Sequence, residues 1–413
     1  MTAENPGITG TTESTARNAT TAPTATTEPN ESHQPTEFGY WVPNVSGGLV
    51  TSSVSQRTDW GIDYNRRVAK LAEERGFGHA LTQVRYLGSY SAANQHESVS
   101  FSLALLEATE RLNVIAAVHP GLWQPGVLAN LAATAQEIHG GRFALNIVSG
   151  WLRDEFRALG EPWLEHDERY RRSAEFLQVL RRLTHGEPGG GGTEFAGDFY
   201  RIRDYSLTPR PSTPPTLFAG GASGAAQANA GRHADWYLTN GATDAELSRQ
   251  IREVRGHAAR AGRRVRVGVN GFAIVRDTEE EARRQLSDIV AGADRRAVEA
   301  FAAAVRQAGA AAPDGRGMWA NSSFDDLVQY NDGFKTGLIG TPERVARRIV
   351  ELRRLGVDLI LLGFLHVEEE LDRFGRDVIP LVRELEASGA VQSPEPIEQA
   401  SGQRDETPAP VAG

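Results

Sequence analysis

Short apolar segments rich in Val, Ile, Phe and Tyr alternate with segments of helical period along most of this sequence. Such alternation favours parallel strands joined by crossover helices. Eight strands are predicted, at residues 38–43, 79–84, 114–119, 143–148, 216–219, 236–239, 265–275 and 359–364. The helices predicted between them include residues 63–75, 97–111, 129–139, 169–183, 245–261 and 343–355. We therefore predict the α/β class and, because eight strands close a ring, a (β/α)8 TIM barrel with insertions.

The barrel is predicted to occupy residues 37–387, and the 40% hydrophobic composition supplies a large core for it. Residues 1–36 consist mainly of Thr, Ala, Glu, Asn and Pro, and residues 388–413 are rich in Pro, Gln, Glu and Ser. Neither segment has enough apolar surface to offset the entropy lost on ordering. We therefore expect a disordered leader and a disordered tail.

Two segments interrupt the alternation. Residues 186–215 contain a glycine run followed by alternating aromatic and aliphatic positions, which predicts an inserted hairpin. Residues 295–335 begin as an Ala-rich helix and continue as a polar, mobile loop over about 313–335 without a strand. Insertions that follow barrel strands lie at the catalytic face and often act as lids, although a surface excursion without function is the alternative.

The charge and composition exclude several classes of protein. A net charge of −9 argues against a nucleic-acid partner or an anionic membrane surface. The absence of Cys excludes disulfides and thiolate chemistry, and no His spacing typical of a metal site is present. No apolar stretch is long enough to span a membrane, and no signal peptide is evident, so a cytoplasmic protein without a metal is expected.

The first chemical signal is a predicted strand that runs through two glycines into a helix at residues 218–223. Gly221 and its neighbour allow close approach of an anion, and the following helix offers free N–H groups and the positive end of its dipole. Ser223 adds a hydroxyl donor. The pattern fits a phosphate, but strand–Gly–Gly–helix turns are also common without one.

Other signals are polar and aromatic residues at the strand ends, where barrel enzymes bind their substrates. Asn146 interrupts a strand that would otherwise be aliphatic, so it either points to a ligand or satisfies a local hydrogen bond. Residues 166–170 open a helix that contains Tyr170. The candidate strand-end residues are Trp41, His96, His119, Trp151, Phe364 and His366.

Taken together, these motifs resemble the luciferase-like flavin monooxygenases, in the alkanesulfonate monooxygenase group. The resemblance is carried, in order, by residues 110–112, 119–121, 140–150, 166–170, 220–223 and 235–239. Within that group the chain is similar to the subfamily that oxidises dimethyl sulfone. That closer similarity lies in residues 40–48, 61–66, 94–99 and 362–366.

The resemblance implies a bacterial-luciferase-like barrel that uses reduced FMN (FMNH2) and O2 to convert dimethyl sulfone to methanesulfinate and formaldehyde. It implies a separate NAD(P)H-dependent FMN reductase as partner, and a homodimer or homotetramer. The residues that it places at the flavin are Asn146, Ser149, Tyr170, Gly221, Ala222 and Ser223. The candidate catalytic residues are the strand-end residues Trp41, His96, His119 and Phe364 together with Asn270 and Phe272.

The sequence departs from the sulfonate enzymes where they carry charged groups. Asn270 and Phe272 replace an Arg and a His of the seventh strand, Phe364 replaces a Tyr, and Asn331 corresponds to a loop Arg. A buried sulfonate needs a cationic partner, whereas a sulfone is neutral. These replacements therefore favour a small uncharged organosulfur substrate, with Arg85 and His119 left as polar contacts.

Several alternatives stay open at this stage. The substrate could instead be an alkanesulfonate or another small organosulfur compound, or the chain could be a non-catalytic flavin-binding barrel. His96 or His119 could transfer protons, because imidazole titrates near neutral pH, or either could be structural.

Overall fold

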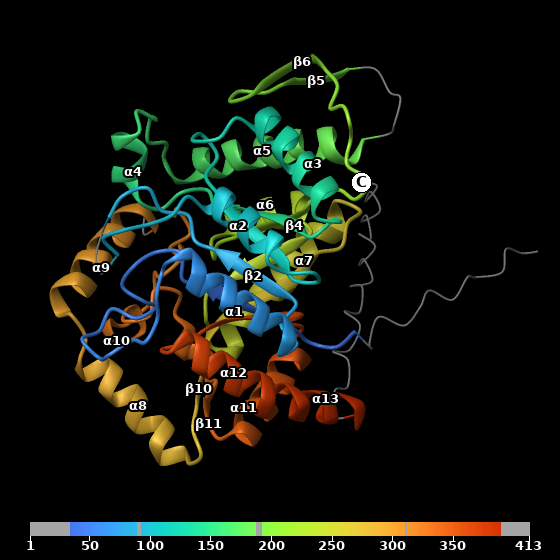
Figure 1. Ribbon diagram of the computed structural model, residues 1–413. Coiled ribbons are helices and arrows are strands. Elements are labelled where there is room, and N and C mark those ends of the chain that lie inside the picture. The colour runs from blue at the N-terminus through green and yellow to red at the C-terminus, as the bar shows by residue number, and fades with distance from the viewer. Residues whose placement is uncertain (1–33, 89–91, 187–191, 310–311, 390–413) are drawn as a thin grey trace, which may run out of the picture. The chain divides into compact units, whose positions relative to one another are not determined.

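The structure, a computed structural model, describes residues 34–88, 92–186, 192–309 and 312–389. Eight parallel strands form a closed barrel in the order β1-β12-β9-β8-β7-β4-β3-β2 (Figure 1). The strands are β1 (Glu37–Val42), β2 (His79–Thr82), β3 (Asn113–Val118), β4 (Phe143–Ile147), β7 (Thr216–Gly220), β8 (Trp236–Thr239), β9 (Arg266–Phe272) and β12 (Leu359–Gly363). The predicted (β/α)8 barrel is thus confirmed.

Helices surround the barrel, as Figure 1 shows. Those of the barrel layer are α1 (Ile62–Glu74), α2 (Ser98–Glu107), α3 (Pro125–Ile138), α5 (His166–His185), α6 (Gly224–His233), α7 (Asp244–Arg260), α11 (Pro342–Arg354), α12 (Val367–Asp377) and α13 (Ile379–Ala387). Capping residues in the sequence define where several of these helices begin. Thr243 and Glu246 form a capping box at α7, and Thr341 followed by Pro342 opens α11.

The hydrophobic core has two parts. A small cluster fills the barrel interior, where the rings of Phe218 and Trp236 stack at 5.4 Å and Trp41 packs against the cluster. A much larger cluster lies between the strands and the helices. The barrel is therefore a packed scaffold, and space for a ligand remains at its end rather than along its axis.

The predicted strand at residues 265–275 is wrong as a single element. The barrel strand β9 ends at Phe272, and the chain then forms β10 (Ile274–Val275), which pairs in parallel with β11 (Ile339–Gly340) outside the barrel. The backbone leaves the barrel at Ala273, whose nitrogen donates to the Gly363 carbonyl. The sequence hides this break because residues 267–275 are buried without interruption.

The two segments predicted as insertions contain the following elements. The first contains the antiparallel pair β5 (Thr193–Ala196) and β6 (Arg201–Tyr205), although residues 187–191 of the predicted range lie outside the described residues. The second comes after α8 (Glu279–Ala291) and begins with α9 (Arg295–Gly309). From residue 312 to 336 it contains α10 (Phe324–Leu327) and the 3-10 helix η2 (Gly333–Thr336), with no strand among the described residues.

The boundary predicted for the leader is too late by a few residues. Thr36 is fully buried, and its backbone nitrogen and hydroxyl donate to Glu386 of α13 at 2.8 and 2.6 Å. Residues 1–33 of the predicted leader fall outside the described residues, as does the tail from residue 390. No helix within the described ranges combines the length and apolar character needed to cross a membrane.

Candidate active site

A cavity of about 190 Å³ opens at the carboxyl ends of the barrel strands. Trp41 and Asn146 each precede the last residue of their strands, and Asn270 lies near the end of β9. The inserted segment supplies the opposite wall. The lining side chains used below are those of Trp41, Arg85, Asn146, Ser149, Trp151, His166, Arg169, Tyr170, Asn240, Asn270, Trp319, Gln329, Tyr330 and Asn331. The site therefore joins the rigid barrel to the insertion.

Hydrogen bonds fix one polar wall of this cavity. The Trp41 indole nitrogen donates to the side-chain oxygen of Asn270 at 2.9 Å, and the Asn270 amide nitrogen donates to the side-chain oxygen of Asn240 at 3.3 Å. All three side chains are uncharged. The wall can therefore offer hydrogen-bond donors and acceptors to a ligand without imposing a charge.

The glycine turn after β7 packs closely against Tyr170 of α5. Gly221 has φ of +129°, and a Cβ on it would lie 2.5 Å from the Tyr170 hydroxyl oxygen. Burial raises the pKa of Tyr170, so its hydroxyl stays protonated and can donate a hydrogen bond. A side chain at position 221 would displace the Tyr170 hydroxyl, so glycine is what allows this donor to lie against the turn, as a phosphate site requires.

The first turn of α6 already holds an anionic group. Ser223 caps the helix by accepting from the Ala226 nitrogen, and the Gly224 nitrogen donates to the Asp314 carboxylate at 2.7 Å. Although burial acts to raise it, hydrogen bonds from Gly224 and Arg316 hold the pKa of Asp314 below its usual value. The residues present thus fit an FMN phosphate, because a carboxylate from the insertion shows that this helix end accepts negative charge.

Four of the residues predicted as catalytic do not line the cavity. His96 is stacked between Trp60 and Phe101, with centroid distances of 4.7 and 5.0 Å. Phe272 is covered by the edge of Phe334 from η2. Phe364 packs among the rings of the outer core, with Phe77 and Phe374. In each case an aromatic partner takes the side chain away from the ligand space.

His119 is the fourth of these residues, and it lies buried behind the cavity. Its Nδ1 lies 2.8 Å from the Val148 carbonyl, and its Nε2 faces the fully buried Glu155 carboxylate at 3.8 Å. Burial lowers the pKa of His119. The imidazole is therefore neutral near pH 7, and the carbonyl fixes its proton on Nδ1.

Two charged residues at or behind the cavity, Glu155 and Arg169, were missed by the sequence interpretation, whereas Arg85 lines the cavity as expected. The Arg85 guanidinium lies 5.0 Å from the Trp151 ring and 4.0 Å from Glu155. Glu155 is on the short helix α4 (Arg153–Ala158), which the alternation of strands and helices does not reveal. The Arg169 side chain donates to the Gly150 carbonyl and lies over Trp163. An acidic residue five positions after Gly150, the glycine that follows β4, was the available signal for Glu155.

Comparison with known proteins places this barrel, with its cavity at the carboxyl ends of the strands, in the class of flavin-dependent monooxygenases. The luciferase-like monooxygenase profile matches residues 36–359, so the chain belongs to the luciferase-like monooxygenase family. It is similar to an FMNH2-dependent dimethylsulfone monooxygenase of Pseudomonas putida, with 56% identity over 86% of this chain and 97% of the relative. The protein of the same description from Pseudomonas fluorescens strain Pf0-1 is also 56% identical, over 86% and 96% of the two chains.

Among solved structures, the fold is similar to that of a riboflavin lyase determined with a modified FMN and riboflavin. The TM-score is 0.73 at 21% identity, covering 87% of this chain and 93% of the other. At this level of identity the likeness concerns the fold alone.

Proposed function

We propose that this protein oxidises dimethyl sulfone with FMNH2 and O2, yielding methanesulfinate, formaldehyde, FMN and water. One oxygen atom is transferred to a methyl carbon, whose bond to sulfur then breaks, and the other oxygen atom leaves as water. The two hydrogens and two electrons come from FMNH2. A separate NAD(P)H-dependent reductase would supply that flavin, and a homodimer or homotetramer is the proposed assembly.

The observation that carries this proposal is the uncharged polar wall of Trp41, Asn270 and Asn240, in a chain whose 56% identical relatives act on this sulfone. A sulfone offers two oxygen acceptors and no charge. A primary amide has two N–H groups, and the bond to Asn240 uses one of those on Asn270. The amide therefore suits a dipolar substrate better than an anion.

Arg85, one of the two arginines among the described residues that line the cavity, does not alter this preference. Arg85 lies 4.0 Å from Glu155, whose side chain is completely buried, so the two charges balance. A sulfonate entering beside this pair would place a third, uncompensated charge in a largely apolar space. Arg85 can still donate a hydrogen bond to a neutral substrate.

We assign the flavin to the residues around the glycine turn. Gly221, Ala222, Ser223 and Tyr170 would hold the phosphate, whereas Asn146 and Ser149 would lie beside the ring system. Bound FMNH2 supplies the electrons that activate O2, a reaction that no side chain performs alone. The chain binds, orients and shields the reactants, and the segment at residues 313–335 would exclude water as a cover over the cavity.

The direct test is an assay of the purified protein with an FMN reductase, NADH, O2 and a panel of sulfones and sulfonates. We expect formaldehyde and methanesulfinate in equal amounts from dimethyl sulfone. Preferential turnover of a sulfonate would replace the substrate assignment. No turnover with any compound, together with equal affinity for FMN and FMNH2 in anaerobic titrations, would identify a non-catalytic flavin-binding barrel.

A further inference from the structure

We propose that Asp332 and Asn240 are positioning residues that hold the Trp41 indole and the Asn270 amide in place as the polar wall of the cavity. Neither residue is close in sequence to Trp41 or Asn270, and Asp332 belongs to the inserted segment rather than to the barrel. Their effect on turnover rests on the proposed function, whereas their effect on the wall does not.

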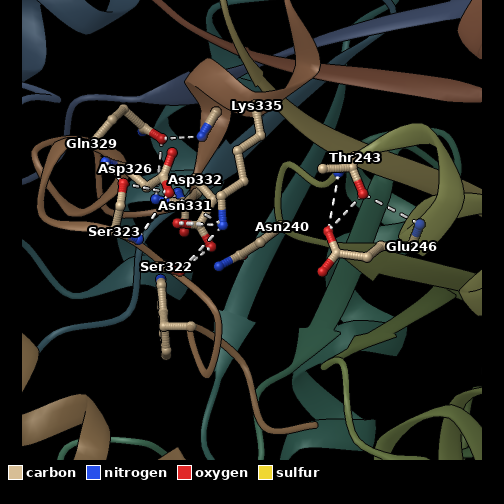
Figure 2. Close-up of polar contacts among 12 residues, drawn as sticks. Asn240, Thr243, Glu246, Ser322, Ser323, Asp326, Gln329, Asn331, Asp332 and Lys335 are labelled. Atoms are coloured by element: carbon tan, nitrogen blue, oxygen red, sulfur yellow. Dashed lines mark hydrogen bonds and ion pairs between the residues drawn. The ribbon is translucent and has the colours of Figure 1, made fainter.

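The three side chains form a series of hydrogen bonds in which each one donates to the next. Trp41 donates to Asn270, and Asn270 donates to Asn240. Because the oxygen of Asn240 accepts this bond, its amide nitrogen is directed elsewhere, and Figure 2 shows the Asn240 side chain pointing towards Asp332. The Asn240 amide nitrogen and the Asp332 Oδ1 are both buried and have no hydrogen-bond partner among the described residues, which leaves this donor and this acceptor for each other. A carboxylate can only accept. Asp332 therefore sets the orientation of the Asn240 amide, and through it that of Asn270.

Asp332 is held firmly enough to act in this way. Its side chain is 5% exposed, and its carboxylate accepts from the Ser322 hydroxyl at 2.9 Å and lies 3.7 Å from the Lys335 ammonium (Figure 2). Its backbone has φ of +54°, a conformation that a non-glycine residue keeps only where its surroundings enforce it. Burial raises the pKa of Asp332 to about 6, so burying the ionised carboxylate at this position costs folding free energy.

The same segment reaches the barrel beside Asn240. The Gly241 nitrogen donates to the Asn331 carbonyl at 2.9 Å, and a Cβ on Gly241 would lie 2.0 Å from the Asp332 carbonyl oxygen. Residues 329–331 of this segment also line the cavity. The packing of this segment against Gly241 brings Asp332 next to Asn240. The orientation of the wall therefore depends on how the segment packs on the barrel.

The test uses the Trp41 indole N–H as a reporter of the wall. Its resonance in the ¹H–¹⁵N spectrum of Trp-labelled protein is identified by its loss in Trp41→Phe. We expect Asp332→Asn to shift this resonance, and to raise KM for dimethyl sulfone about tenfold, since the variant replaces a charged acceptor of the Asn240 amide by a neutral one. Ser322→Ala, which removes one bond to Asp332, should have a smaller effect of the same kind.

The double variant Asn240→Asp with Asp332→Asn provides a specific rescue. It moves the carboxylate to position 240, where it still accepts from Asn270, and leaves an amide at position 332 to donate to it. We expect this exchange to restore the indole resonance and KM, while Asn240→Asp alone does not. Asp325→Asn is the matched control, because Asp325 is an exposed residue of the same segment and should leave both readouts unchanged.

A folded Asp332→Asn protein with an unshifted Trp41 resonance would overturn the proposal. Failure of the exchange variant to restore the resonance would also overturn it, because a merely structural loss is not repaired by moving the charge. If the resonance shifts as expected but no variant, nor the unmodified protein, turns over dimethyl sulfone, the positioning role stands and the proposed function fails.

Discussion

The Asp314 carboxylate accepts a hydrogen bond from the Gly224 nitrogen at 2.7 Å, at the helix end assigned to the FMN phosphate. Two anions at one helix N-terminus compete for the same N–H groups. We therefore expect Asp314→Ala to tighten FMNH2 binding several-fold in anaerobic titrations. Riboflavin, which has no phosphate, should bind the variant and the unmodified protein equally.

Asp325→Ala, in the same segment but exposed, is the matched control for that experiment. Weaker FMNH2 binding in Asp314→Ala would mean that the carboxylate supports the flavin site rather than competing at it. Equal tightening of riboflavin binding would show that the effect does not concern the phosphate.

Gly221→Ala tests the phosphate site by obstructing it rather than by removing a competing anion. The added Cβ would lie 2.5 Å from the Tyr170 hydroxyl, so either the hydroxyl or the ligand must move. We expect FMN affinity to fall at least about tenfold, roughly 1.4 kcal/mol. Gly262→Ala introduces the same methyl group at another positive φ, +65°, where nothing lies within 4 Å, and should leave FMN affinity unchanged. Equal affinity in the two variants would refute the assignment.

The sequence was sufficient for the barrel because its signals are local and repeated. Each strand is a short apolar run followed by a helical period, and eight such units leave few arrangements. The site was predicted only in part. Trp41, Asn146 and Asn270 could be found because a polar or large aromatic residue near a strand's carboxyl end is unusual in a buried parallel strand.

The remaining site residues depend on contacts that no local pattern encodes. In the sequence, Asn240 is an ordinary loop residue after β8, and only the structure shows its hydrogen bond with Asn270. His96 and Phe364 sit near strand ends as predicted, but aromatic neighbours distant in sequence decide that they face away from the cavity. Side-chain direction just beyond a strand is set by tertiary packing, which is why these positions could not be assigned from the chain alone.

The pH dependence of stability should reveal Asp332. Its folded pKa of about 6 lies above the ordinary 3.8, so the folded state binds this proton more tightly than the unfolded state. Stability from this group is therefore greatest below about pH 4 and falls as pH rises to about 6, by up to about 3 kcal/mol. The nearby Lys335 and Asp326 partly offset each other.

Urea unfolding of the unmodified protein and Asp332→Asn between pH 4 and 7.5 isolates this contribution, since other titrating groups cancel in the difference. We expect the free energy of unfolding of Asp332→Asn, relative to the unmodified protein, to rise with pH over this window. A constant difference would show that Asp332 titrates normally.

The amino-terminal boundary can be tested by truncation. A chain that begins at Gln34 keeps the hydrogen bonds between Thr36 and Glu386, and we expect its melting temperature to match that of the full chain. A chain that begins at Glu37 loses both bonds and leaves Arg383 without the Thr36 carbonyl, so its melting temperature should fall by several degrees. Equal melting temperatures would show that Thr36 does not anchor the barrel.

The central claim is that the cavity accepts a neutral sulfone because its polar wall carries no net charge. The most direct measurement is the ratio of kcat/KM for dimethyl sulfone to that for methanesulfonate in the unmodified protein, coupled to an FMN reductase. An unpaired buried charge costs several kcal/mol, so we expect dimethyl sulfone to be preferred by at least about a hundredfold. Comparable values for the two compounds would contradict the account.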